Sequence, residues 1–253
     1  MTTHSDILET SEDAVLGGRL RLRQPLRGHR VGHDAILLAA ATGGHAGERA
    51  VDLGAGVGAV GLTLALRVPA LKVTLVEIDH ALCALAAGNA RLNGLADRVD
   101  VLNADVEDAD ALSPLSADRV LMNPPFHDES RQNVSPDPRR RLAHSGAPGL
   151  LPRWITTAAR LLKPQGVLTL IWRADALVDV QEALAGAFGC IAVLAVHPRP
   201  NASAIRVLVR AVKSGHGAPV NYPALVLNDE QGRPSAAAEA VLRGGEMLRI
   251  AEI

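Results

Sequence analysis

A regular alternation of short apolar strands and helices begins at Arg49, and it restricts the fold more than any other feature of the chain. Two helices are predicted in this region, AVGLTLALRV and HALCALAAGNARLNG, the second with Asp79 at its start and Gly94 at its end. Four strands are predicted around and after them: RAVDLG, KVTLVEI, RVDVLNA and DRVLMN. Near-continuous apolar strands separated by helices are typical of a parallel sheet that is buried on both faces. The sequence therefore predicts an α/β fold.

Further elements are predicted on both sides of this region. Before it, RLRLR alternates like a strand or one arm of a hairpin, and a helix is expected after Asp34 as its N-cap. After it, a long irregular segment runs from His127 to about Arg153. There follow the helix WITTAARLLK, the strand GVLTLIW, a helix from about Asp175 to Phe188, and the strands CIAVLAVHP and AIRVLVRAV. These last two are expected to be antiparallel because their connector is short. A turn at NDEQGRP and a short helix, SAAAEAVLRGG, are predicted near the end.

Composition limits the class of protein. The chain has 253 residues, of which 48% are hydrophobic, so one α/β domain with additions can bury a sizeable core. The net charge of -1 gives no overall basic signature for nucleic acid. Cys83 and Cys190 are too far apart in sequence for a metal or redox motif. The polar N-terminus resembles no signal peptide and no apolar run is long enough to span a membrane, so we expect a cytoplasmic protein without a metal.

A glycine-rich loop, VDLGAGVGAVG, connects the first strand of the alternating region to its helix. Gly54, Gly56 and Gly58 allow the backbone to turn sharply and a ligand to approach it closely. GVGAVG matches the dinucleotide-binding pattern G-x-G-x-x-G, and Glu77 at the end of the next strand fits the acid that binds a ribose in that pattern. These features alone favour NAD and S-adenosylmethionine equally.

Two aspartates at strand ends favour S-adenosylmethionine. Asp52 precedes the first glycine inside a strand end, where a buried carboxylate needs a cationic or N–H partner. The ammonium of a methionine moiety would supply one, whereas a pyrophosphate would be repelled. Asp105 follows the third strand, where it can accept a hydrogen bond from an adenine amine. These acids and the glycines all fall at the sheet edge where ligands bind in such folds.

A rigid turn, Asn123-Pro124-Pro125-Phe126, follows the fourth strand at the same edge. The prolines fix the backbone and remove two N–H donors. The Asn123 side-chain oxygen and the Pro124 carbonyl can then accept both N–H protons of an exocyclic amine, which would direct its lone pair at a methyl group. Phe126 offers a flat face for a base, worth ~1–3 kcal/mol. Catalysis would rest on orientation and electrostatics.

Four stretches, DLGAGVG, VEID, Asn103-Ala104-Asp105 and NPPF, together resemble class I S-adenosylmethionine-dependent methyltransferases that modify amino groups. VGHDAILLAAAT is similar to the N-terminal segment of bacterial tRNA adenine methyltransferases that act on a valine-tRNA anticodon loop. The resemblance extends from about Arg19 to Lys213, and LVLNDEQGRPSAAAEAVL is similar to the family's C-terminal end. It implies a Rossmann-like fold whose mostly parallel seven-stranded sheet has one antiparallel strand and helices on both faces.

The resemblance also implies domain limits and residue roles. We expect an N-terminal extension with a hairpin and a helix (1–48), a cofactor-binding methyltransferase core (49–213) and a C-terminal tail (214–253). Glycines and Asp52 would surround the methionine moiety, Glu77 the ribose and Asp105 the adenine, and Gly32 and Asp34 would close over the methionine end. The expected cofactor-binding residues are Gly32, Asp34, Asp52, Gly54, Gly56, Gly58, Glu77, Asp105 and Asn123. The expected acceptor site is Asn123, Pro124, Pro125 and Phe126.

The favoured function is thus methyl transfer to an exocyclic amine, with adenine in tRNA as acceptor and the protein acting as a monomer. A protein glutamine amide is the nearest alternative acceptor, and an NAD-dependent oxidoreductase and a catalytically silent RNA-binding module are more distant ones. Arg139, Arg140 and Arg141 are candidates for phosphate contacts or for a solvated loop. For Arg199, between two prolines, a plain hairpin connector is favoured over a place at the rim of the cleft.

Overall fold

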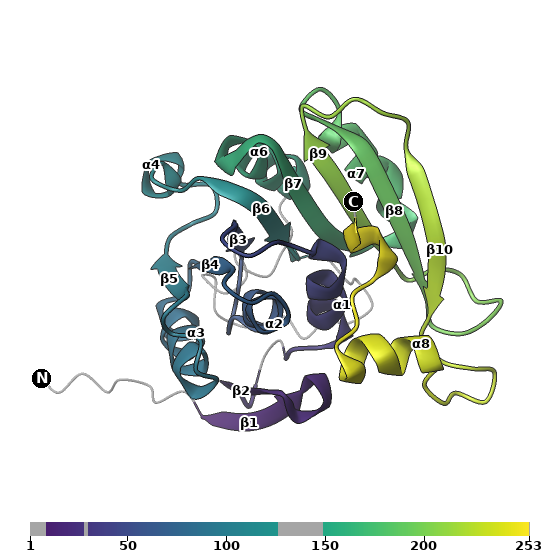
Figure 1. Ribbon diagram of the computed structural model, residues 1–253, viewed down its shortest axis with the longest axis horizontal. Helices are drawn as coiled ribbons and strands as arrows, with labels where there is room; N and C mark the ends of the chain where they lie inside the picture. Colours follow the sequence, from purple (N-terminus) through teal and green to yellow (C-terminus); the bar gives the residue numbers. More distant parts are fainter. Residues whose placement is uncertain (1–8, 28–29, 126–148, 253) are drawn as a thin grey trace, which may run out of the picture.

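An eight-stranded sheet forms the centre of the computed structural model, which describes residues 9–27, 30–125 and 149–252. Its strands are β3 (Arg49–Leu53), β4 (Lys72–Glu77), β5 (Val99–Asn103), β6 (Ala117–Met122), β7 (Leu162–Arg173), β8 (Phe188–His197), β9 (Arg206–Lys213) and β10 (Val220–Val226). Their order is β10-β8-β9-β7-β6-β3-β4-β5 (Figure 1). Only β9 runs antiparallel to its neighbours, β7 and β8, which confirms the mostly parallel sheet and its antiparallel strand pair.

The sheet has one strand more than the seven that the resemblance implied. The additional strand, β10, lies in the C-terminal tail and pairs in parallel with β8 at the edge of the sheet. Its sequence VNYPALV is mostly exposed and contains Pro223, and its register with β8 shifts between Tyr222 and Leu225. Proline within a strand is tolerated mainly at an edge, where the missing N–H donor need not be paired. The proline and the weak alternation explain why this strand was not predicted.

Helices cover both faces of the sheet (Figure 1). On one face, α1 (His33–Thr42), α2 (Ala59–Arg67) and α3 (His80–Leu92) share an apolar core with the sheet. On the other, α6 (Leu150–Leu161) and α7 (Leu177–Leu184) form a second core, to which the short α4 (Ala109–Leu112) contributes. Asp79 caps α3 as predicted, because its side chain accepts hydrogen bonds from the N–H groups of Ala81 and Leu82. No helix in the described ranges has the length and apolarity needed to cross a membrane.

Three predicted helix boundaries were wrong. The N-cap of α1 is Gly32, which has no side chain to cap with, and Asp34 lies in the first turn instead. The helix α6 begins at Leu150, four residues before the predicted start, so residues 150–153 are helical rather than irregular. The predicted helix from 175 to 188 is a 3-10 turn, η2 (Ala174–Ala176), followed by α7, which ends at Leu184. Phe188 instead begins β8 and packs into the core.

The N-terminal hairpin docks onto α3 through two asparagines. It consists of β1 (Thr10–Val15), the 3-10 turn η1 (Leu16–Gly18) and β2 (Leu20–Pro25), as the RLRLR pattern predicted. The backbone N–H and C=O of Arg21 bond to the Asn93 side chain at 2.9 and 2.7 Å, and those of Arg23 bond to Asn89 at 2.8 and 3.0 Å. Asparagine amides thus replace a strand partner, which fixes the hairpin on the core.

Candidate functional site

The residues predicted at strand ends meet at one edge of the sheet. In the register of the sheet, Leu53 at the end of β3 pairs with Val76 of β4 on one side and with Met122 of β6 on the other. Glu77 of β4 pairs with Asn103 of β5. The glycine loop, Glu77, Asp105 and Asn123 therefore lie at the carboxyl ends of four neighbouring parallel strands, where such folds bind ligands.

The glycine loop packs closely against Trp154 of α6. Gly54 has φ +69°, and a Cβ added to it would lie 2.5 Å from Cη2 of Trp154 in α6. Gly56 has φ +56°, and a Cβ there would have no atom within 4 Å. Gly54 thus makes room for an indole, whereas Gly56 borders open space on which a ligand can lie. Trp154 was not singled out from the sequence, because nothing local shows that α6 passes under this loop.

Glu77 supports the loop from the neighbouring strand. Its Oε2 accepts a hydrogen bond from the Gly56 N–H at 2.8 Å, and its Oε1 accepts one from the Asp79 N–H at 2.9 Å. Glu77 as a whole residue is 8% exposed. A carboxylate has lone pairs for about four hydrogen bonds, so Glu77 can fix the loop and still accept ribose hydroxyls.

Asp52 is a buried acid behind the loop. It is 1% exposed, and its Oδ2 accepts a hydrogen bond from the Gly61 N–H in α2 at 2.9 Å. The N–H partner that a buried carboxylate requires is therefore supplied by the protein itself. Burial raises the pKa of Asp52 to about 7, the nearby charge of Glu77 adds to the rise, and the Gly61 hydrogen bond opposes it. A cation near the loop would favour the ionised form.

Asp105 and an exposed isoleucine flank the far side of the same edge. Asp105 is exposed, and its Oδ1 accepts a hydrogen bond from the Glu107 N–H at 2.9 Å, which leaves further acceptor positions. Ile78, directly after Glu77, is 56% exposed, although large apolar side chains are usually buried. The Asn103 amide donates to the carbonyls of Glu77 and Ile78, both at 2.9 Å. Ile78 was missed from the sequence, where it was assigned to the strand; it offers an apolar surface for a ring.

Asn123 carries an unused acceptor at the end of β6. Its Oδ1 atom is buried and accepts no hydrogen bond from any residue that the structure describes. An orphaned buried amide oxygen costs roughly 1–3 kcal/mol, so its retention needs an explanation. Pro124 is buried and Pro125 is partly buried, and their rings restrict the backbone at both positions. Phe126, His127, His144 and Arg139 to Arg141 lie outside the described residues, as does His29.

An ion pair fixes the start of α1 beside this edge. Nε of Arg206, the first residue of β9, donates to Oδ2 of Asp34 at 2.9 Å, and both side chains are partly buried. Gly32 precedes α1 as its N-cap. Arg206 was not predicted as a site residue, because it lies 172 residues from Asp34 and no local pattern joins the two. Arg199 lies in the β8–β9 connector, where its carbonyl accepts from the Ala202 N–H in a turn.

In the described ranges, no three or more His, Cys, Asp or Glu side chains are arranged so that they could bind a metal ion. The donor set at the strand ends instead fits an organic cation carrying a ribose and a base. It combines buried carboxylates at Asp52 and Glu77, an open glycine backbone at Gly56 and an apolar surface at Ile78. S-adenosylmethionine has these parts.

Comparisons with known proteins agree with this chemistry. The sequence model of the methyltransferase small domain family matches residues 31–199, more than half of the chain. A tRNA1(Val) (adenine(37)-N6)-methyltransferase of Porphyromonas gingivalis is 34% identical over 159 residues, which are 60% of this chain and 62% of that protein. The enzyme with the same name from Shewanella amazonensis is 30% identical, over 62% of this chain and 66% of that one. The chain thus spans about two thirds or less of the length of these relatives.

Solved structures show the same architecture. A crystal structure described as a predicted O-methyltransferase from Agrobacterium tumefaciens superposes with a TM-score of 0.71 at 28% identity. The superposition covers 85% of this chain and 98% of that one. TrmN from Thermus thermophilus has a TM-score of 0.50 at 23% identity, with 71% of this chain and 47% of that one covered, and shows the fold alone.

Proposed function

Because the chain belongs to the methyltransferase small domain family, we propose that it transfers a methyl group from S-adenosylmethionine to an exocyclic amine, with adenine in tRNA as the acceptor. The observation that carries this proposal is the buried, unused Oδ1 of Asn123. It lies at the end of β6, next to the strand that leads into the glycine loop. An acceptor at that place is suited to an amine N–H.

The cofactor would lie along the carboxyl edge of β3, β4 and β5. Gly56 provides open backbone, Glu77 acceptors for ribose hydroxyls, and Asp105 an acceptor for the adenine amine, with Ile78 against the ring. Asp52 is too buried for an easy direct contact, so it would act through its charge and through the placement of α2. Gly32 and Asp34 would close the methionine end. When bound, the cofactor supplies a methyl group on a positively charged sulfur.

Asn123 and Pro124 would prepare the acceptor. An amine conjugated to a ring is a weak nucleophile, since its lone pair is delocalised. With one N–H donated to Asn123 Oδ1 and the other to the Pro124 carbonyl, the nitrogen becomes more tetrahedral and its lone pair turns out of the ring plane. The methyl group would pass from the sulfonium sulfur, which would leave as a neutral thioether when its bond to the methyl carbon breaks. The nitrogen would become positively charged as it gains that carbon, and it would then lose one proton to water. Phe126, outside the described residues, would stack on the base.

The choice of tRNA rests on the relatives, whose names give adenine 37 of a valine tRNA as their target. A cytoplasmic location and a monomeric state follow as parts of the same proposal. The Agrobacterium neighbour is described as acting on oxygen. Removing a hydroxyl proton calls for a general base, whereas the strand end here carries a neutral amide. A protein glutamine amide would use the same hydrogen bonds and is the alternative to exclude.

The experiment is a transfer assay with the methyl-labelled cofactor. Unmodified bulk tRNA, a glutamine-containing release-factor peptide and a catechol would be offered separately, and binding of NAD would be measured alongside. We expect label in tRNA only, recovered after digestion as N6-methyladenosine by mass spectrometry, and no binding of NAD. Label in the peptide or the catechol would instead assign that acceptor, and NAD binding without methyl transfer would contradict the proposal altogether.

Asn123→Ala tests the residue that carries the proposal. We expect normal affinity for S-adenosylmethionine by calorimetry and a turnover reduced by about 10²–10³-fold, the usual cost of one well-placed polar group at a reacting centre. Asn228→Ala, in the tail, is a matched control that should keep both quantities. Unchanged turnover in Asn123→Ala would exclude the assigned role.

Asp52→Ala should differ from Asn123→Ala, because its main defect should be a weakened affinity for the cofactor.

A further inference from the structure

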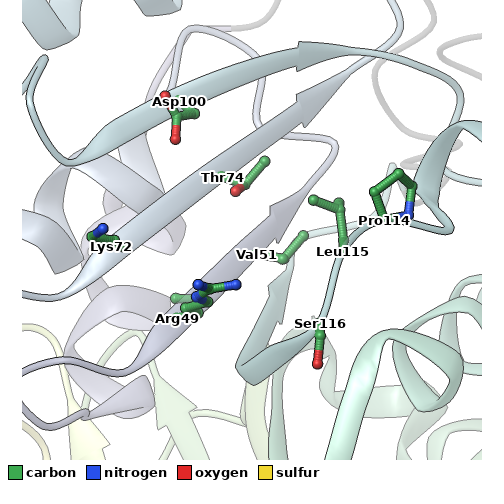
Figure 2. A pocket seen from close by; sticks show the side chains of 9 residues that line it. Arg49, Val51, Lys72, Thr74, Asp100, Pro114, Leu115 and Ser116 are labelled. Carbon is green, nitrogen blue, oxygen red and sulfur yellow. The ribbon is translucent and has the colours of Figure 1, made fainter.

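A hollow of about 260 Å³ lies at the opposite edge of the sheet, away from the proposed cofactor site. Arg49 and Lys72, the first residues of β3 and β4, line it, whereas the glycine loop and Glu77 lie at the other ends of these strands. Figure 2 shows their side chains on the same face of the sheet as Asp100 of β5, next to the loop that precedes β6. The hollow is therefore a separate place on the molecule.

Two positive charges stand side by side in this hollow. Arg49 and Lys72 are direct neighbours in the parallel register of β3 and β4, and both are exposed. Like charges opposite each other on neighbouring strands are destabilising. Among the residues that the structure describes, neither side chain forms an ion pair. An anion placed between them would remove this repulsion.

A carboxylate next to Arg49 is already engaged. Asp118 accepts the backbone N–H of Arg49 with Oδ2 at 2.9 Å, and its Oδ1 pairs with Lys163 at 2.7 Å. Asp100 lines the hollow from β5, in register with Thr74 rather than with either cation. The two cations are thus left open to a ligand, while Asp100 is a separate acceptor on the far side.

The rest of the lining suits the other parts of a nucleotide. Pro114 and Leu115 give the hollow an accessible apolar surface, next to the buried Val51 (Figure 2). Thr74 and Ser116 contribute hydroxyl groups. Cations, hydroxyls, an apolar wall and one carboxylate occur together at sites that bind a phosphate, a sugar and a base.

We propose that this hollow binds a nucleotide unit. Its phosphate lies between Arg49 and Lys72, its ring packs on Pro114 and Leu115, and Asp100 accepts a hydrogen bond from a sugar hydroxyl or a ring amine. Both a free mononucleotide and one nucleotide of an RNA chain have this chemistry. The site does not depend on methyl transfer, since none of its residues lies at the proposed catalytic edge.

Binding of adenosine monophosphate, inorganic phosphate and adenosine would be measured by calorimetry at low salt. We expect the monophosphate to bind more tightly than either of its parts. In the variant with both Arg49→Gln and Lys72→Gln, its affinity should fall at least tenfold, while affinity for S-adenosylmethionine stays unchanged. Arg91→Gln, an exposed cation of α3, is the control and should change neither. Because the substitutions remove a like-charge contact, the ligand-free double variant should melt at or above the wild-type temperature.

Bulk tRNA distinguishes the two sources of the nucleotide. If the hollow holds part of an RNA chain, the slope of log affinity against log salt concentration should become shallower by about 1–2 in the double variant. Loss of monophosphate binding with an unchanged slope would assign a free nucleotide. The proposal is overturned if the double variant binds both the monophosphate and tRNA as the wild type does. A lower melting temperature in the double variant would also count against the proposal, because it would mean that Arg49 and Lys72 stabilise the fold.

Discussion

Asp52 shows how one buried side chain is used at this site. One role of Asp52 is structural. Its carboxylate accepts a hydrogen bond from the Gly61 N–H and so joins β3 to α2 behind the glycine loop. The same burial raises its pKa to about 7, so the protonated and ionised forms are both populated near neutral pH. A cationic cofactor would lower that pKa, so cofactor binding and loss of a proton from Asp52 should be coupled.

The stability of the protein should therefore fall with rising pH because of Asp52. In the unfolded chain an aspartate ionises near its ordinary pKa of 3.8, whereas in the folded protein burial raises the pKa to about 7. Between these values the folded state binds the additional proton, so the free energy of unfolding falls as the pH rises from about 4 to about 7. Asp52→Asn removes this loss, which amounts to at most ~4 kcal/mol.

Melting temperatures of wild type and Asp52→Asn, measured from pH 5 to pH 8 without cofactor, test this. The melting temperature of the variant should increase relative to that of the wild type as the pH rises. Asp97→Asn, the same substitution at an exposed position, is the control. A constant difference for Asp52→Asn would mean that Asp52 is already ionised in the folded protein at pH 5.

At the scale of elements, α6 shapes the glycine loop. The indole of Trp154 occupies the space that a Cβ on Gly54 would need, whereas the space beside Gly56 is open. Two glycines of one motif thus have different reasons to be glycine. The first permits packing of the loop on a helix, and the second leaves the backbone free for a ligand.

Gly54→Ala and Gly56→Ala should differ in what they damage. Both place alanine at a positive φ, at a cost of about 1–2 kcal/mol each. Gly54→Ala also forces its Cβ against Trp154, which adds ~1–3 kcal/mol, so urea unfolding should show the larger loss there. Gly56→Ala should instead weaken cofactor binding more than stability. Combining Gly54→Ala with Trp154→Leu should recover part of the loss; equal losses in the two single variants would contradict this division of roles.

The ion pair between α1 and β9 has its own test. If Asp34 acts by holding the start of α1 through Arg206, then Asp34→Asn and Arg206→Gln should each weaken cofactor binding by up to about fivefold, the limit for a partly exposed pair. The double variant should be no worse than either single one. Arg233→Gln removes an exposed pair with Asp229 and serves as control. A defect in Asp34→Asn alone would mean that Asp34 contacts the cofactor directly.

At the scale of the whole molecule, the C-terminal segment is part of the core. Val241, Leu248 and Ile250 are buried in the same cluster as α1 and α2, and the Leu248 N–H bonds to the carbonyl of Ala40 at 2.9 Å. This segment includes α8 (Ala236–Glu239), the π-helical turn η3 (Ala240–Gly244) and the 3-10 turn η4 (Arg249–Glu252). It covers the outer side of α1 (Figure 1), which explains why α1 is apolar almost all round.

Arg67 joins that segment to the cofactor-binding half. From the end of α2 it donates to the carbonyls of Val241, Gly245 and Glu246, and burial lowers its pKa to about 10. Arg67→Gln should lower the free energy of unfolding by about 2–3 kcal/mol, because three carbonyls lose a charged donor. It should also speed proteolysis after residue 240 while leaving cofactor affinity unchanged. Arg243→Gln, which removes only an exposed pair with Glu239, should cost less than about 0.5 kcal/mol; equal costs would show that the Arg67 contacts contribute little.

The sequence by itself determined the sheet, its central helices and the edge at which the site lies. Apolar runs and helical periods are local, and parallel strands joined by helices must end at the same edge, so Asp52, Glu77, Asp105 and Asn123 could be grouped without coordinates. The resemblance added Gly32 and Asp34, whose place beside that edge no local pattern would give.

Only the tertiary structure decided which partner each of these residues has. The pairing of Asp34 with Arg206, the contact of Trp154 with Gly54 and the register that sets Arg49 against Lys72 join segments that no local pattern relates. The edge strand β10 escaped prediction for the same reason, since the burial of its Leu225 depends on packing beside β8. Periodicity reports which side of an element is buried, whereas partners depend on how distant elements pack.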